Sequence, residues 1–351
     1  MTIRYDADRL AAFAKSLLEK MDLPSDRAAV VADILVEGDL MGHTTHGLQL
    51  LASYLKEIDQ GGMAVSGEPK VLQDRGAAVT WDGEYLPGPW LVVRAMELAF
   101  ERIAGAHPVV TVVIRRSHHI ACLQAYLKRA TDHGHVILLM SSDPSCGSVT
   151  PHGGCSPLYT PNPIAAGFPT DGEPILIDIS TSTTTNGMTQ RLYDAGQRLS
   201  HEWLIDYQGR SSSDPAVLFT DPPGAILPLG GLESGHKGFA LGLLVEALTA
   251  SLGGFGRADG PKRWGASVFL QIIDPAAFGG LANFKRESGW LAAACRNAAG
   301  LPGGSGVRLP GQRGLALRRE YLDSGVALAA TIMPLLEPWA VKLGVALPSA
   351  V

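Results

Sequence analysis

The chain has 351 residues, of which 46% are apolar and 18% charged, and its formal net charge is −5, from 29 basic and 34 acidic residues. This composition is typical of a packed globular protein with one large domain or two interleaved ones, and it offers no basic surface for nucleic acid. The four cysteines form no CxxC pair, and no run approaches the roughly 20 apolar residues that cross a bilayer. We therefore expect a cytoplasmic protein with reduced thiols, no nucleic acid partner and no membrane role.

The first seventy residues are predicted to be helical. Apolar residues recur every three to four positions in residues 7–21, which is typical of an amphipathic helix. Pro24 and the two polar residues after it can begin a second helix over 26–41, which ends at Gly42. Residues 46–58 predict a third helix, which stops at a glycine pair.

From Val71 onward the pattern changes to mixed α and β. Short β-branched segments bounded by Gly, Pro and Asp predict strands at 77–83, 108–115, 135–142, 174–180 and 266–273. Helical patterns fall between them, at 88–103, 123–133 and 236–252. The alternation would permit a parallel doubly wound sheet, but it does not fix the strand order.

After residue 280 the apolar spacing again favours helices, over 290–298 and 319–341, with a Gly- and Pro-rich stretch over 301–314. We expect these helices to pack on the N-terminal ones. The predicted organisation is a smaller helical domain made of residues 1–72 and 285–351, around a larger mixed α/β domain of residues 73–284.

Proteins that bind a nucleotide cofactor commonly carry a glycine-rich loop between a strand and a helix. Neither GxGxxG nor GxxxxGK[ST] occurs in such a place. A standard Rossmann domain is therefore not expected, although other ways of binding a nucleotide stay open.

The stretch GHTTHG places His43 and His46 three residues apart, between hydroxyl groups and glycines. The spacing lacks the acid of a helical HExxH zinc motif. Three roles stay open for these imidazoles: metal ligands, structural groups at the end of a helix, or a proton-transfer site.

A second histidine pair, His118 and His119, follows the apolar strand over 108–115 directly. Ends of strands commonly carry site residues. We expect one of the two imidazoles to face solvent, and for one of them both a functional and a structural role stay open.

Two further features suggest an anion or nucleotide site. Asp178 lies within the apolar run PILIDIS, ahead of STSTTTNG, where a buried carboxylate needs a partner. It either caps the following turn or belongs to a cluster that holds ribose or phosphate. Lys237 is predicted at the start of an apolar helix, where a cation opposes the helix dipole but can bind an anion together with the free N–H groups.

Taken in order, these motifs resemble the malate/L-lactate dehydrogenase-like oxidoreductases, a family that includes sulfolactate, ureidoglycolate, diketogulonate and cyclic-imine reductases. The matching motifs run along nearly the whole chain: GDLMGHTTHG, RRSHHIA, TPHGG, TPNPIAAGFP, LIDISTST, GHKGFALGLLVEAL and RLPGQRG. The resemblance implies a mixed α/β fold that binds NAD or NADP without a Rossmann domain. It also implies a homodimer with active sites near the subunit boundary.

The resemblance implies roles for individual residues as well. His46 corresponds to the proton donor to the substrate carbonyl or imine, and Thr45 and His119 correspond to groups that orient the substrate. The implied nucleotide contacts come from three segments, which comprise Ile177, Asp178, Ile179, Ser180, Thr181, Ser182 and Thr183, then His236 and Lys237, and then Pro310, Gly311 and Gln312.

The chain departs from the family at positions that bear on the substrate. Leu50 stands where family members typically carry an arginine that binds a carboxylate, and Met41 replaces another arginine. Losing a charged hydrogen bond typically costs ~1.5–3 kcal/mol. Either another cation (Arg115, Arg116 or Lys56) replaces Leu50, or the substrate is less charged and more apolar at that end.

The sequence therefore predicts an NAD- or NADP-dependent oxidoreductase without a metal. It would interconvert a 2-oxo acid or cyclic imino acid and the 2-hydroxy or amino acid, with His46 as acid and base. One alternative is a metal-dependent hydrolase built from His43, His46, His119 and Asp178. Another is a nucleotide-binding family member that has lost turnover or acts on a substrate without a carboxylate.

Overall fold

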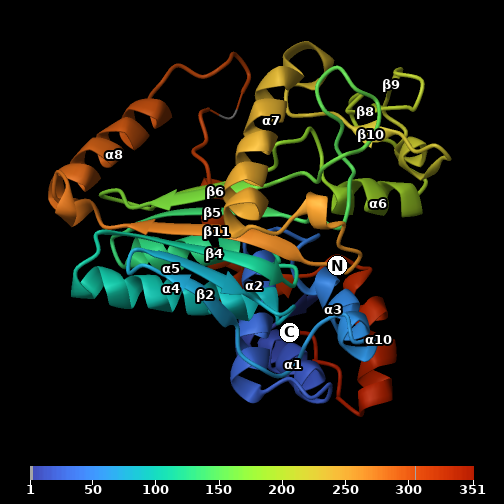
Figure 1. The fold of residues 1–351 in the computed structure, drawn as a ribbon, viewed down its shortest axis with the longest axis horizontal. Helices are drawn as coiled ribbons and strands as arrows, with labels where there is room; N and C mark the ends of the chain where they lie inside the picture. The colour runs from blue at the N-terminus through green and yellow to red at the C-terminus, as the bar shows by residue number, and fades with distance from the viewer. Residues whose placement is uncertain (1–2, 305) are drawn as a thin grey trace.

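The centre of the fold is a seven-stranded sheet with the order β2-β3-β4-β11-β5-β6-β7 (Figure 1). The computed structural model describes residues 3–304 and 306–351. In sheet order the strands are β2 (Lys70–Asp74), β3 (Ala78–Asp82), β4 (Val109–Ser117), β11 (Ala266–Ile273), β5 (Val136–Ser142), β6 (Ile164–Phe168) and β7 (Ile175–Ile179). Within the described residues, β3 and β4 run parallel and every other neighbouring pair in this sheet is antiparallel.

The middle strands β4 and β11 are rich in β-branched and apolar residues, which suits strands that are covered on both faces. Helices α4 (Gly88–Gly105) and α5 (Gln124–Asp132) cover one face. Helix α7 (Gly231–Glu246), continued by the π-helical turn η3 (Ala247–Ser251), covers the other (Figure 1). Because both faces of these middle strands are covered, their ends are where a ligand can approach them.

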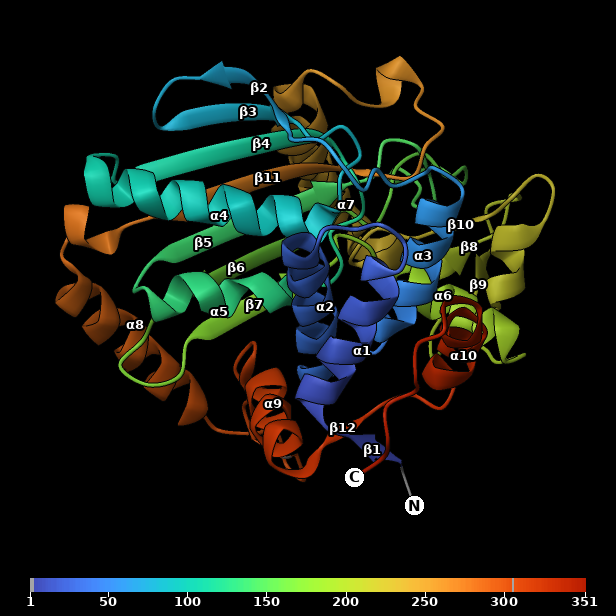
Figure 2. The ribbon, with the colours of Figure 1, turned by 90° about the horizontal axis from the view of Figure 1, so that it is seen from below.

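Helices from both ends of the chain gather beside the sheet (Figure 2). They are α1 (Ala7–Glu19), α2 (Ser25–Leu40), α3 (Leu51–Asp59) with its preceding 3-10 turn η1 (Leu48–Leu50), α9 (Gln312–Ser324) and α10 (Ile332–Leu343). Helix α2 packs against α1, α4, α5 and α9, so it is buried on most sides. One hydrophobic core runs from these helices into the sheet.

The two ends of the described chain are tied together. Strand β1 (Arg4–Tyr5) pairs with β12 (Val326–Ala327), and the N–H of Val351 donates to the carbonyl of Arg4 at 3.0 Å. Asp6 then caps α1 by accepting the N–H of Arg9 at 2.9 Å.

A third group of elements extends beyond α7. It comprises α6 (Asn186–Asp194), the 3-10 turn η2 (Pro215–Phe219) and a small sheet of β10 (Ala225–Ile226), β8 (Leu204–Ile205) and β9 (Ser211–Ser212). This group has a small core of its own around Tyr159 and Ile226. Two further 3-10 turns, η4 (Arg257–Asp259) and η5 (Pro275–Ala277), flank β11.

Helix α8 (Leu281–Arg296) lies at the far end of the sheet in Figure 1. Its residue Ala292 packs with Ile175 of β7 and with Leu309. Helices α9 and α10, by contrast, contact α2 and α3. The domain boundaries expected at residues 72/73 and 284/285 stay a prediction.

The expected mixed α/β class is confirmed, and the sheet is not the parallel sheet of a Rossmann fold. Two expected elements were wrong. The helix predicted over 319–341 is two helices, because Gly325, with φ +86°, ends α9. Helix α7 begins at Gly231 and not at His236, so Lys237 lies in its second turn. None of the helices in the described ranges has the length and apolar character that crossing a membrane requires.

Candidate active site

A cleft of about 530 Å³ opens where the N-terminal helices meet the ends of the sheet strands. Its walls are the loop after α2, the segment after β4, the ends of β5, β6 and β7, the first turn of α6, and the segment that leads into β11. The lining residues are Gly42–His46, Leu50, His119–Leu123, Ser141–Asp143, Thr160–Pro163, Asp178, Ser180, Thr185–Met188 and Trp264–Ala266.

The loop that carries His46 is held by the carboxylate of Asp39, near the end of α2. Oδ2 of Asp39 accepts the N–H of Leu48 at 2.7 Å, which satisfies one of the free donors at the start of η1 and α3. A Cβ at Gly47 would lie 2.4 Å from this carboxylate, so any other residue there would have to displace it. Burial raises the pKa of Asp39 to about 7.

His46 is fixed by its neighbour Thr45, whose hydroxyl lies 2.9 Å from Nδ1. Burial, and after it the imidazole of His43 and the guanidinium of Arg191, lower the pKa of His46 to about 4. The ring is therefore neutral near pH 7. In the tautomer with the proton on Nδ1, this group donates to Oγ1 of Thr45 and leaves the lone pair of Nε2 free to accept a proton.

His119 lies near His46, with 6.0 Å between ring centres. Its Nδ1 is 3.2 Å from the N–H of Ala121 and 2.8 Å from the hydroxyl of Tyr54. A main-chain N–H can only donate, so Nδ1 accepts and the proton of neutral His119 is on Nε2. Burial, followed by the charges of the neighbouring histidines, holds the pKa of His119 well below its usual value.

The neighbouring His118 is buried against Tyr54 and Trp264. His118 is buried and His119 is half-buried, so the expectation that one of the two adjacent histidines faces solvent was wrong. The two rings have different surroundings: His119 lines the cleft, and His118 packs behind it.

Arg191, on helix α6, also holds the loop that carries His46. Its guanidinium donates to Thr44 twice, to Oγ1 at 3.0 Å and to the carbonyl oxygen at 2.9 Å. Cβ of Thr45 would lie 3.4 Å from a Cβ at Gly187, so the first turn of α6 also touches the loop. Arg191 thus places a positive charge close to His46 without itself lining the cleft.

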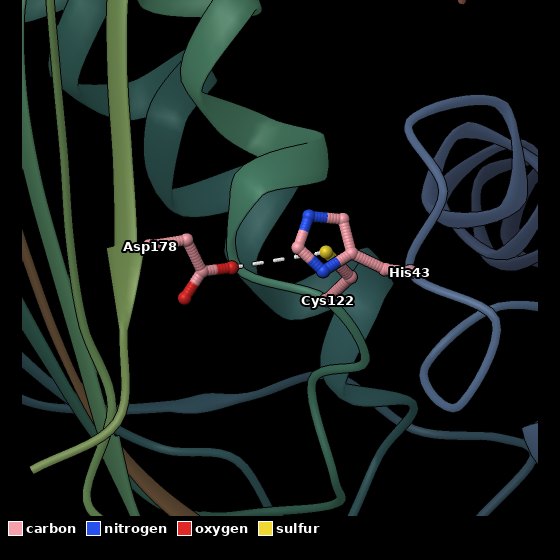
Figure 3. A group of neighbouring side chains, drawn as sticks. All are labelled: His43, Cys122 and Asp178. Atoms are coloured by element: carbon pink, nitrogen blue, oxygen red, sulfur yellow. Dashed lines mark hydrogen bonds between the residues drawn. The ribbon is translucent and has the colours of Figure 1, made fainter. Parts of the chain in front are cut away.

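A second cluster lies on the cleft wall, formed by His43, Cys122 and Asp178 (Figure 3). Oδ2 of Asp178 accepts the N–H of Gln124 at 2.9 Å and the thiol of Cys122 at 3.8 Å. Nε2 of His43 bonds to Oε1 of Gln124. Burial raises the pKa of Asp178, and the imidazole of His43 opposes this rise. Asp178 therefore caps α5 as well as facing the cleft.

The same three side chains offer donor atoms that all lie within 4.8 Å of one another. The metal-site alternative expected a different set, of His43, His46, His119 and Asp178. Among the described residues the group that could hold a metal contains neither His46 nor His119, because these two form a separate pair. Each member of the group that does form has a hydrogen-bond partner in the protein.

Of the predicted nucleotide contacts, Asp178 and Ser180 line the cleft. The hydroxyls of Ser180, Thr181, Ser182 and Thr183 all donate to main-chain carbonyls, so they support the turn and leave only acceptor lone pairs for a ligand. The other predicted contacts lie outside the cleft lining: Ile177, Ile179, Thr181, Ser182, Thr183, His236, Lys237, Pro310, Gly311 and Gln312.

Two of these segments have clear positions. Pro310 and Gly311 lie against β7, where the N–H of Leu176 donates to the carbonyl of Pro310 at 3.3 Å. Lys237 and His236 are exposed on α7. Lys237 does not join the free N–H groups of a first helical turn, as had been predicted, because α7 begins at Gly231.

Comparison with known proteins decides the family. The family model for malate/L-lactate dehydrogenase matches residues 5–337. The chain belongs to this dehydrogenase family. The L-lactate dehydrogenase of Cupriavidus necator is 30% identical over 344 residues, which cover 96% of this chain and 97% of the relative. The (2R)-3-sulfolactate dehydrogenase (NADP(+)) of Chromohalobacter salexigens is 32% identical over 328 residues, covering 91% and 92%.

The fold agrees with solved structures of the same family. The malate dehydrogenase of Pyrococcus horikoshii OT3 superimposes with a TM-score of 0.88 at 27% identity, covering 98% of this chain and 97% of that one. The protein is therefore an oxidoreductase that acts on CH–OH groups, and the hydrolase alternative does not stand.

Sequence reasoning missed two residues of this dehydrogenase that position the loop, Asp39 and Arg191. One alternative was that Arg115, Arg116 or Lys56 binds the substrate in place of an arginine at Leu50, and the positions of these three side chains do not agree with it. Arg115 and Arg116 pair with Asp82 at 2.9 and 2.6 Å, and Lys56 is exposed. None of the three lines the cleft.

Proposed function

We propose that the protein is an NAD- or NADP-dependent dehydrogenase that interconverts a 2-oxo acid, or a cyclic imino acid, and the corresponding 2-hydroxy or amino acid. The observation that carries the proposal is the His46–His119 pair, with ring centres 6.0 Å apart on the cleft wall of a chain from this dehydrogenase family. The bound nicotinamide ring supplies or accepts the hydride at C2 of the substrate.

His46 moves the proton. In the oxidation direction its neutral form takes a proton from the 2-hydroxyl group, and in reduction the protonated form returns it to the carbonyl or imine. Its lowered pKa, about 4, keeps the ring unprotonated and able to accept a proton at neutral pH. Thr45 keeps the ring in place through Nδ1.

His119 orients the reacting oxygen or nitrogen. Because its Nδ1 accepts from Ala121, its Nε2–H is the group that can donate to the substrate. Two fixed imidazoles of different role hold the substrate in one orientation, which is the protein's main contribution to a hydride transfer.

The cofactor would be held by the segments at the end of β7. Asp178 would accept a ribose hydroxyl through Oδ1, which has no hydrogen-bond partner among the described residues. Ser180 would offer its acceptor lone pairs beside it. The remaining predicted contacts are Ile177, Ile179, Thr181, Ser182, Thr183, His236, Lys237, Pro310, Gly311 and Gln312.

The deciding experiment is an absorbance assay at 340 nm with NADH and NADPH against 2-oxo acids and cyclic imines, and with the oxidised cofactors against 2-hydroxy acids. Replacing His46 with Asn should lower turnover about a hundredfold and leave cofactor binding, measured by fluorescence, unchanged. The matched control is H201N, an exposed histidine on the far segment around Trp203. Full activity in H46N would remove His46 from the mechanism.

We further propose a cytoplasmic homodimer, as the family resemblance implies. The apolar surface of α7 supports it, since Leu243 and Leu244 are 52% and 45% exposed. Light scattering should give twice the monomer mass for the native protein. A monomeric native protein would contradict the proposal, and L243D/L244D should produce monomers.

A further inference from the structure

The cleft lining contains no positive side chain among residues 3–304 and 306–351. The ionisable groups that line it are the carboxyls of Asp143 and Asp178, together with the imidazoles of His43, His46 and His119. Burial lowers the pKa of His46 and His119, so both are neutral near pH 7. Among the described residues of this chain, the cleft lining therefore offers a substrate anion hydroxyl groups and neutral rings, and no guanidinium or ammonium group.

Cations close to the cleft are engaged elsewhere. Arg116 binds Asp82 and Glu84 at 2.6 and 2.7 Å. Arg257 binds Glu246 at 2.9 Å and the carbonyl of Asp143. Arg263 donates to the carbonyls of Gly61 and Gly62. Turning any of these toward a ligand would break hydrogen bonds that are already made.

Leu50 and Trp264 contribute large apolar side chains to the cleft lining. Leu50 also packs against the main core. Tyr54 lies one helical turn later on α3, and its ring is 6.0 Å from Trp264. Trp264 in turn lies 5.1 Å from the ring of His119. Leu50 and Trp264 thus both give the cleft apolar surface, and Trp264 does so next to His119.

We propose that the substrate is a 2-oxo or 2-hydroxy monocarboxylate whose remaining carbons are uncharged and apolar, and that Leu50 determines this specificity. The inference rests on the proposed function. A second carboxylate or a sulfonate at the far end would be desolvated beside Leu50 and Trp264 without a charged partner. An isopropyl or similar group there would instead gain hydrophobic contact.

The single carboxylate next to the reacting carbon would be met by hydroxyl donors. Oγ1 of Thr44 accepts a hydrogen bond from Arg191 at 3.0 Å, so the proton of this hydroxyl is free to donate to a ligand. Thr44 lines the cleft. The guanidinium behind it polarises the hydroxyl, which suits one anion at this position.

The test compares two substrates of nearly the same size and shape. In 4-methyl-2-oxopentanoate an isopropyl group takes the place of the terminal carboxylate of oxaloacetate. We expect kcat/KM for 4-methyl-2-oxopentanoate to exceed that for oxaloacetate by about tenfold or more, the value of one missing charged hydrogen bond. The assay follows NADH and NADPH oxidation by the full-length protein.

The variant L50R places a guanidinium in the cleft lining. It should raise kcat/KM for oxaloacetate by about tenfold or more and lower it for 4-methyl-2-oxopentanoate. The matched control is L50M, which keeps a neutral side chain of similar volume and should keep the preference of the native protein. Circular dichroism and cofactor binding verify that both variants are folded.

The outcomes separate this inference from the proposed function. Turnover that prefers oxaloacetate in the native protein would overturn the inference and leave the dehydrogenase proposal standing. An unchanged substrate ratio in folded L50R would also overturn it. No turnover of any 2-oxo acid or cyclic imine with either cofactor would overturn the proposed function itself.

Discussion

Asp39 and Gly47 approach so closely that a Cβ at residue 47 would lie 2.4 Å from the carboxyl carbon of Asp39. The contact joins the end of α2 to the loop that carries His46, one residue before Gly47. The position of the proposed acid therefore depends on a carboxylate that lines no part of the cleft itself.

Replacing Gly47 with Ala should displace the loop. The added methyl group overlaps the Asp39 carboxylate, and overpacking of this kind typically costs about 1–3 kcal/mol of stability. We expect turnover to fall about a hundredfold, since a displacement near 1 Å can have that effect on catalysis. Gly105→Ala is the control, because a Cβ there meets open space. Unchanged turnover in G47A would show that the loop position is not critical.

The pH profile of the oxidation reaction should report His46. The base is active in its neutral form, and its pKa lies near 4 instead of 6.5 because of burial and the nearby positive charges. We therefore expect kcat/KM for a 2-hydroxy acid to stay level as pH falls from 8 to about 5 and to drop only as pH falls further toward the pKa. An acid limb near pH 6.5 would contradict this assignment of the environment.

Arg191 should act on that profile through charge and position. In R191M the two hydrogen bonds to Thr44 are lost, and turnover should fall about tenfold. Because the guanidinium lowers the pKa of His46, its removal should move the acid limb to higher pH. R198M, which removes an exposed arginine paired with Asp214, should leave the limb in place. A purely structural role for Arg191 would lower turnover without moving the limb.

His118 should make the fold sensitive to acid. Burial lowers its pKa from 6.5 to about 3, so between these values only the unfolded chain takes up a proton at this side chain. The free energy of unfolding is therefore not reduced by this side chain above pH 6.5, and it decreases steadily as pH falls from 6.5 toward 3. In H118L, melting temperatures should fall less steeply between pH 7 and 4.5 than in the native protein, while H201N keeps the native slope. Equal slopes for H118L and the native protein would contradict the prediction.

Much of the architecture was predictable, because long periodic segments define their own structure. The apolar runs of β4, β5 and β11 and the amphipathic pattern of α1 lie close to their predicted positions. Strand β6 was missed because its sequence, IAAGF, is short and has only small residues, Ala-Ala-Gly, at its centre. Gly167 in it is set by packing, since Ile137 and Leu127 would lie 3.1 Å from a Cβ there.

The site was predictable only where the residues carry a motif. The resemblance pointed to His46 and His119, and the structure brings them together. Arg191 and Thr44 are 147 residues apart in the chain, and no spacing rule connects such positions. The start of α7 was misplaced because a pair of glycines, Gly230 and Gly231, is typical of a loop. Both do have positive φ, but the helix already begins at the second of them.

The absence of lysine and arginine from the described cleft lining also bears on how fast a substrate arrives. Many enzymes that act on anions have a positive electrostatic potential around the active site. This potential accelerates association with the substrate, and salt weakens the effect. Here the chain carries a net charge of −5, and two of its acidic side chains, Asp143 and Asp178, line the cleft. An anionic substrate is then repelled on approach, and added salt screens that repulsion. Capture should accordingly be slow in dilute buffer and faster at the ionic strength of a cell.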